Sequence, residues 1–149
     1  MALLILSKQV IQPEETVASV AVVAFKKGFK LVLDGWHNIE NRHNTDIYIS
    51  RANDNQEYFY LGIESVDDII ESYDLLNLKF EDASFYRLAV TDQAEFDHLI
   101  YDFALEYLRL NPDHCISLYG ETFFFLEDME KLESKGGYYK DWCYKKPEN

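Results

Sequence analysis

Two adjacent residues, His114 and Cys115, are the first candidates for chemistry in this chain, which has four histidines and two cysteines. A thiolate activated by an imidazole is a nucleophile, and histidine also titrates near neutral pH. With Asp113 they lie at the mouth of a short predicted strand, and adjacent residues in an extended chain point to opposite faces. A catalytic Cys–His pair would therefore need a partner from elsewhere in the fold. The sequence favours a small buried thiol at this position.

The other histidines show no metal or cofactor motif. His37 and His43 are six residues apart with Glu40 between them, whereas a two-histidine site on a helix needs a spacing of four. His98 and Asp102 have that spacing on a predicted helix, and an ordinary side-chain pair explains them. The glycines do not form a phosphate-binding loop. We therefore predict no metal, no cofactor and no identifiable catalytic residue.

Charge is the most unusual property of the sequence. Asp and Glu number 27 against 14 Lys and Arg, which gives a formal net charge of -13. This charge opposes binding to nucleic-acid phosphates and to anionic membranes. Residues 57–97 hold eleven acidic residues against Lys79 and Arg87, so the excess is concentrated in the middle of the chain.

The segment 65–75 predicts an acidic amphipathic helix. Ser65 followed by Asp68 resembles a capping box, and the apolar and acidic residues that follow separate onto two arcs of a helical wheel. One interpretation is a solvated face that keeps the chain soluble. The other is a surface that binds a basic protein, for which the candidate residues are Asp67, Asp68, Glu71, Asp74, Glu81 and Asp82.

The chain of 149 residues suits one domain, and 48% hydrophobic residues suit a substantial core. We predict a single α+β domain over residues 1–149, with a mixed β-sheet, one antiparallel hairpin and helices packed on the sheet. The expected strands are 3–6, 29–33, 46–51, 57–63, 85–90 and 115–119, with an aromatic tail at 138–146 that could dock as a last strand. The expected helices are 13–27, 65–75, 93–110 and 124–135.

The helix 93–110 is the best-determined of these elements. Its main apolar sector contains Phe96, Leu99, Ile100, Phe103, Tyr107 and Leu110. A second apolar strip, formed by Tyr101, Leu105 and Leu108, lies outside that sector. The helix is therefore either sandwiched within the fold or a contact through which the chain forms a homo-oligomer.

Two cysteines are too few for a disulfide framework, and we expect Cys115 and Cys143 to be reduced and not bonded to each other. No secretory leader or membrane-spanning segment is recognisable, since the apolar runs are too short. These features favour a cytoplasmic protein.

Two hypotheses about function follow. The first is an acidic, non-enzymatic binding protein that captures a basic partner protein, in the manner of an immunity protein or antitoxin that blocks a nuclease toxin. The alternative is a small cytosolic enzyme or ligand-binding domain, with a pocket near Trp36, His37, His114 and Cys115. The alternative requires those side chains to converge in space.

Overall fold

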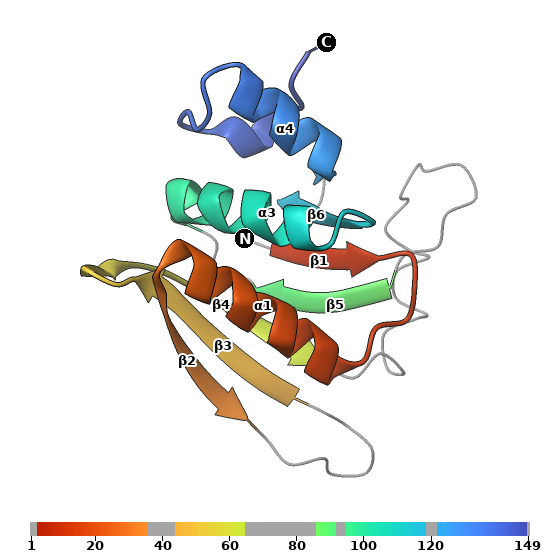
Figure 1. Cartoon of the computed structure of the whole chain (residues 1–149), viewed down its shortest axis with the longest axis vertical. Coiled ribbons are helices and arrows are strands. Elements are labelled where there is room, and N and C mark those ends of the chain that lie inside the picture. The colour runs from red at the N-terminus through yellow and green to blue at the C-terminus, as the bar shows by residue number, and fades with distance from the viewer. Residues whose placement is uncertain (1–2, 36–43, 65–85, 92–94, 119–121, 149) are drawn as a thin grey trace.

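The computed structural model describes residues 3–35, 44–64, 86–91, 95–118 and 122–148. Seven strands form one sheet in the order β2-β3-β4-β5-β1-β6-β7 (Figure 1). The strands are β1 (Leu3–Ser7), β2 (Phe29–Gly35), β3 (Asn44–Arg51), β4 (Asp54–Glu64), β5 (Tyr86–Thr91), β6 (His114–Leu118) and β7 (Thr122–Phe124). The helices are α1 (Pro13–Lys27), α3 (Asp97–Leu110), α4 (Leu126–Ser134) and a 3-10 turn, η3 (Trp142–Tyr144).

The predicted α+β class, the hairpin and the helices packed on the sheet are confirmed, but the sheet differs from the mixed one expected. Every strand pair within the described residues is antiparallel. The expected β-α-β crossover connects β5 through α3 to β6, and these two strands do run parallel. They flank β1, which pairs antiparallel with each of them, so the crossover produces no parallel ladder.

Helix α1 has the bounds that its local sequence predicts. Pro13 occupies the first turn, where no intrahelical bond to its nitrogen is lost. The Glu15 side chain accepts a hydrogen bond from the Gln12 backbone N–H at 3.1 Å. At the other end Gly28 has a φ of 67°, a left-handed conformation that costs glycine little. The chain then turns directly into β2.

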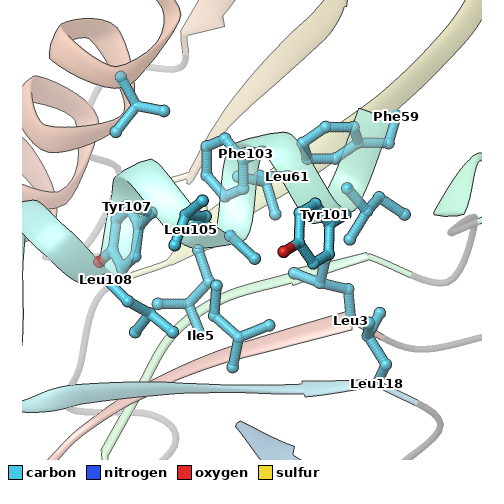
Figure 2. Packing of buried hydrophobic residues seen from close by; sticks show 14 of the residues in the cluster. Leu3, Ile5, Phe59, Leu61, Tyr101, Phe103, Leu105, Tyr107, Leu108 and Leu118 are labelled. Carbon is cyan, nitrogen blue, oxygen red and sulfur yellow. The ribbon is translucent and has the colours of Figure 1, made fainter. Parts of the chain in front are cut away.

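The main core lies between the sheet and a layer made of α1 and α3, which pack side by side on one face (Figure 1). Phe103 of α3 meets Phe59 of β4 edge-to-face, with ring centroids 5.2 Å apart (Figure 2). Of the predicted apolar sector of α3, Leu99, Ile100, Phe103 and Tyr107 are fully buried. Leu110, the last residue of the helix, is instead 40% exposed.

The second apolar strip of α3 is also buried, so it is not a contact for another chain. Tyr101, Leu105 and Leu108 are between 0% and 6% exposed. Helix α4 packs against α3, and the Tyr101 hydroxyl donates a hydrogen bond to Glu133 Oε1 at 2.6 Å. The helix is sandwiched within the fold, and the oligomer predicted through the 93–110 helix is not supported.

Two predicted boundaries were wrong. Helix α3 begins at Asp97, because Phe96 has a non-helical backbone (φ -98°, ψ 82°) and packs its ring against Tyr58, with ring centroids 5.7 Å apart. The tail 138–146 forms η3 and turns where a strand was expected. Its Trp142 indole N–H donates to the backbone oxygen of Asp97 at 2.8 Å, and the ring is fully buried against Tyr101 and Phe124. Burial of one large ring therefore determines the path of the tail.

Both cysteines are free and buried, as predicted. Among the described helices, none combines the length and the apolar character that crossing a bilayer requires.

Candidate protein-binding surface

The six acidic residues predicted to bind a partner lie outside the described residues. They are Asp67, Asp68, Glu71, Asp74, Glu81 and Asp82. Trp36 and His37 of the alternative pocket, together with Glu40 and His43, also lie outside that part of the chain. Within the described residues, no group of His, Cys, Asp and Glu side chains is arranged to hold a metal ion.

The strand β6 separates His114 from Cys115, as strand geometry predicts. His114 is opposite Ser7 and is hydrogen-bonded through Nδ1 to the Tyr107 hydroxyl of α3 at 2.9 Å, which places it on the helix side of the sheet. Cys115 is opposite Leu6 on the other face. Burial raises the pKa of the Cys115 thiol to about 12, so it is protonated at neutral pH. These two side chains do not form a nucleophile and its base.

The buried imidazole of His114 should make the stability of the fold depend on pH. Burial lowers the pKa of its imidazole, and the charge of Asp113 opposes this only in part. The unfolded chain takes up a proton near pH 6.5 while the folded chain does so only at lower pH. The free energy of unfolding should therefore be highest above pH 6.5 and should fall as the pH decreases towards the folded pKa. The loss is at most about 1.4 kcal/mol per pH unit for one proton.

Urea unfolding of the wild type and His114→Gln between pH 7.5 and 5 would measure this effect. Glutamine can retain a hydrogen bond to the Tyr107 hydroxyl but does not titrate. The difference in stability between the two proteins should shrink as the pH falls. A constant difference across this range would contradict the assignment.

A polar cluster joins the tip of the β3–β4 hairpin to the beginning of α3. Arg51 donates to Glu57 at 2.8 Å and to Asp102 at 3.0 Å. His98 Nε2 lies 3.8 Å from Asp102, which agrees with the predicted pair, and its ring stacks on Tyr138 at 4.0 Å. The carboxylates here already have partners, so the cluster ties the hairpin and the tail to α3.

A small hollow of about 250 Å³ lies beside the C-terminal tail and α4, with three lysines in its lining. Each of these cations already has an acceptor. Lys145 binds Glu148 at 3.0 Å, Lys146 binds Asp128 at 3.3 Å and Lys135 donates to the Glu148 backbone oxygen. The hollow therefore offers little free positive charge to an anion.

The face of β2, β3 and β4 that points away from α1 and α3 is different, because it carries exposed aromatic residues. Val32, Tyr48 and Tyr60 are directly opposite one another across the three strands. Tyr58 lies two residues before Tyr60 on β4, which places it on the same side by strand alternation, and its ring also contacts Phe96 just before α3. Tyr48 and Tyr60 are in contact, with ring centroids 5.9 Å apart. We call the four residues Val32, Tyr48, Tyr58 and Tyr60 the tyrosine face.

Three of the four residues of the tyrosine face are half exposed, and the fourth, Tyr60, is partly buried. Val32 is 48% exposed, Tyr48 42% and Tyr58 44%, while the alternate residues of β3 and β4, such as Ile47 and Phe59, are completely buried. No described helix covers this side of the three strands (Figure 1). Tyrosine is enriched at the energetic centres of protein interfaces, because it combines a large apolar ring with a hydroxyl.

One end of the tyrosine face is acidic. Asp34, Asp46 and Gly62 form the next row across the three strands, so two carboxylates lie directly opposite each other. Neither aspartate has an ion pair with a cation of the described residues. This arrangement favours a partner that brings positive charge to that end of the face.

The sequence carries a signal for this surface in the alternation of residues along β3. The alternation of Asp46, Tyr48 and Ser50 with isoleucines predicted the hairpin and also assigned the tyrosine to its polar face. The position of β2 and β4 on either side of β3 was needed to show that the residues form one row.

No protein-family model matches the chain, and no curated protein or solved structure is significantly similar to it.

Proposed function

We propose that this chain is a non-enzymatic protein that binds a basic partner protein through the tyrosine face. The observation that carries the proposal is the row of Val32, Tyr48 and Tyr60 on a part of the sheet that no described helix covers, in which Val32 and Tyr48 are half exposed and Tyr60 is partly buried. Such a row supplies the desolvated aromatic centre of an interface, and the polar residues around it supply the rim.

Charge selects the class of partner in this proposal. Asp34 and Asp46 lie at one end of the tyrosine face, and the whole chain carries a net charge of -13. Long-range attraction of this kind accelerates association with a basic protein and suppresses acidic competitors. In this proposal a further set of acidic residues attracts the basic partner before contact is made: Asp67, Asp68, Glu71, Asp74, Glu81 and Asp82. An inhibitor of the immunity-protein or antitoxin type, which blocks a basic nuclease, would use these features.

The test is capture of a partner by immobilised protein from a lysate of the native host, followed by measurement of its binding kinetics. We expect a basic protein whose affinity falls about tenfold or more with Tyr48→Ala, as for an interface hot spot. Tyr139→Ala is the matched control, because Tyr139 is 50% exposed but follows α4, away from the sheet face. The Tyr139→Ala variant should bind the partner with the same affinity as the wild type.

Substitutions that remove charge distinguish long-range attraction of the partner from direct contact at the interface. Two variants should lower the association rate, and the effect should be greatest at low ionic strength. One carries Asp46→Asn alone, and the other combines Asp67→Asn, Glu71→Asn and Asp74→Asn. The reason is that exposed charges are screened beyond about 10 Å at 0.1 M salt. A partner that binds Tyr48→Ala as tightly as the wild type would contradict the role of the tyrosine face. An unchanged rate across a salt titration would contradict the role of charge.

A further inference from the structure

The strand β2 is an edge strand of the sheet formed by the described residues. It pairs with β3 over all seven of its residues, and no other described strand pairs with it (Figure 1). Alternate N–H and C=O groups of an edge strand point outward and can pair with another chain. The opposite edge, β7, has only three residues. A partner strand can therefore form a much longer ladder on β2 than on β7.

Apolar side chains are exposed on both sides of this edge. Val32 and Leu33 are each 48% exposed, and they point to opposite faces of β2. Helix α1, which packs on β2, exposes Phe25 by 89% and Val22 by 42%. Proteins usually protect a free edge from pairing with charge, proline or a bulge. In β2 the central residues are apolar and the ladder with β3 is regular.

The two charges of β2 are unpaired within the described residues. Lys30 lies opposite Ser50, and Asp34 lies opposite Asp46. Like charges that face each other across strands are destabilising. A cation on the free side of Asp34 would relieve this repulsion, but β2 has its own Lys30 four residues away along the strand.

A second copy of the same strand supplies that cation. The residue at the centre of β2 is Val32, so an antiparallel pair of β2 strands in full overlap is symmetric about this residue. In that register Lys30 of each copy lies opposite Asp34 of the other. On the helix side, Leu31 of each copy lies opposite Leu33 of the other. Both charge pairs and both leucine pairs are formed, Val32 lies opposite Val32, and Phe29 of each copy lies opposite Gly35 of the other.

We propose that a second copy of this chain pairs along the free edge of β2 and that the two sheets join symmetrically at Val32. The helices of both copies then lie on the same side of the joined sheet, where the exposed Phe25 and Val22 of α1 add apolar surface near the junction. The two tyrosine faces lie together on the other side. This dimer does not depend on the proposed binding of a basic partner.

The experiment measures the molecular mass of the full chain in solution by sedimentation equilibrium from about 1 to 100 μM. The wild type should approach twice 17.5 kDa as the concentration rises. In the Lys30→Glu homodimer, an acidic residue at position 30 of each copy lies opposite Asp34 of the other. In the Asp34→Lys homodimer, a basic residue at position 34 of each copy lies opposite Lys30 of the other. Each variant alone should weaken dimerisation by about tenfold or more, through two repulsive cross-strand pairs.

Mixing the two variants provides the decisive measurement. A chain carrying Lys30→Glu and a chain carrying Asp34→Lys have complementary charges at both positions, so the mixture should form a heterodimer of wild-type stability. The double variant Lys30→Glu with Asp34→Lys should again form a homodimer. Lys140→Glu makes the same change of charge in the exposed turn after α4 and should leave the dimer unchanged.

Circular dichroism and the urea midpoint show whether each variant is folded. A monomeric wild type at 100 μM would overturn the proposal. A dimer that neither single variant weakens, or a mixture that stays monomeric, would overturn the pairing through β2. If the wild type is monomeric and β2 instead binds a strand of a different protein, the second copy is the wrong occupant.

Discussion

Phe103→Ala is expected to lower the free energy of unfolding by about 3–5 kcal/mol. The Phe103 side chain is completely buried, lies edge-to-face with Phe59 and is stacked 5.6 Å from Tyr107 (Figure 2). Removing it deletes the contact between α3 and β4 and leaves a cavity with rigid walls on both sides. Urea denaturation at neutral pH measures the change.

Leu99 of α3 and Glu95, just before the helix, make this result specific. Leu99→Ala should cost about 2–5 kcal/mol, because Leu99 is also completely buried in the same sector. Glu95→Ala should change stability by less than about 0.5 kcal/mol, since Glu95 is exposed and precedes the helix. A Phe103→Ala protein that unfolds at the wild-type urea midpoint would show that this sector of the helix does not form the core.

Trp142→Ala should have an effect of similar size, about 3–5 kcal/mol, although the residue lies near the C-terminus. Its ring is completely buried, with centroids 5.2 Å from Tyr101 and 5.0 Å from Phe124. Its indole N–H is also bonded to the backbone oxygen of Asp97. The substitution removes the contact that fixes the tail against α3 and β7, and so exposes Tyr101.

The neighbouring Tyr144→Ala serves as the control, because Tyr144 lies in the same 3-10 turn but is 57% exposed. Its effect should stay below about 1 kcal/mol. Intrinsic fluorescence and circular dichroism should then report one cooperative transition in both variants. Equal stability of Trp142→Ala and the wild type would mean that the tail contributes nothing to the core.

Elements with complete local signals could be predicted from the sequence. Helix α1 has Pro13 at its first position and Gly28 after its last, and its bounds are as expected. The alternation in 46–51 and 57–63 predicted the hairpin. Strand β3 begins earlier, at Asn44, but ends at Arg51 as expected, and β4 extends beyond both predicted bounds to Asp54–Glu64. Such signals act between residues close in sequence, so they do not depend on the rest of the fold.

Features set by contacts distant in sequence could not be predicted. The strip of Tyr101, Leu105 and Leu108 is equally consistent with an internal layer or a subunit contact, and only the position of α4 decides between them. The insertion of β1 between β5 and β6, which makes the sheet antiparallel, is likewise not visible in local patterns. The candidate site was sought in acidic residues, whereas the exposed tyrosines became apparent only through the register of three strands.

The place of β1 in the sheet has a consequence for synthesis of the chain on the ribosome. Leu3–Ser7 leave the exit tunnel long before their two partner strands, which are residues 86–91 and 114–118. The β2–β3–β4 unit needs nothing beyond residue 64 to pair its strands. A nascent chain of intermediate length can therefore hold a formed hairpin while an apolar strand of five residues waits unpaired. Pairing of β1, and with it completion of the core, must therefore wait until the strands at residues 86–91 and 114–118 have been translated.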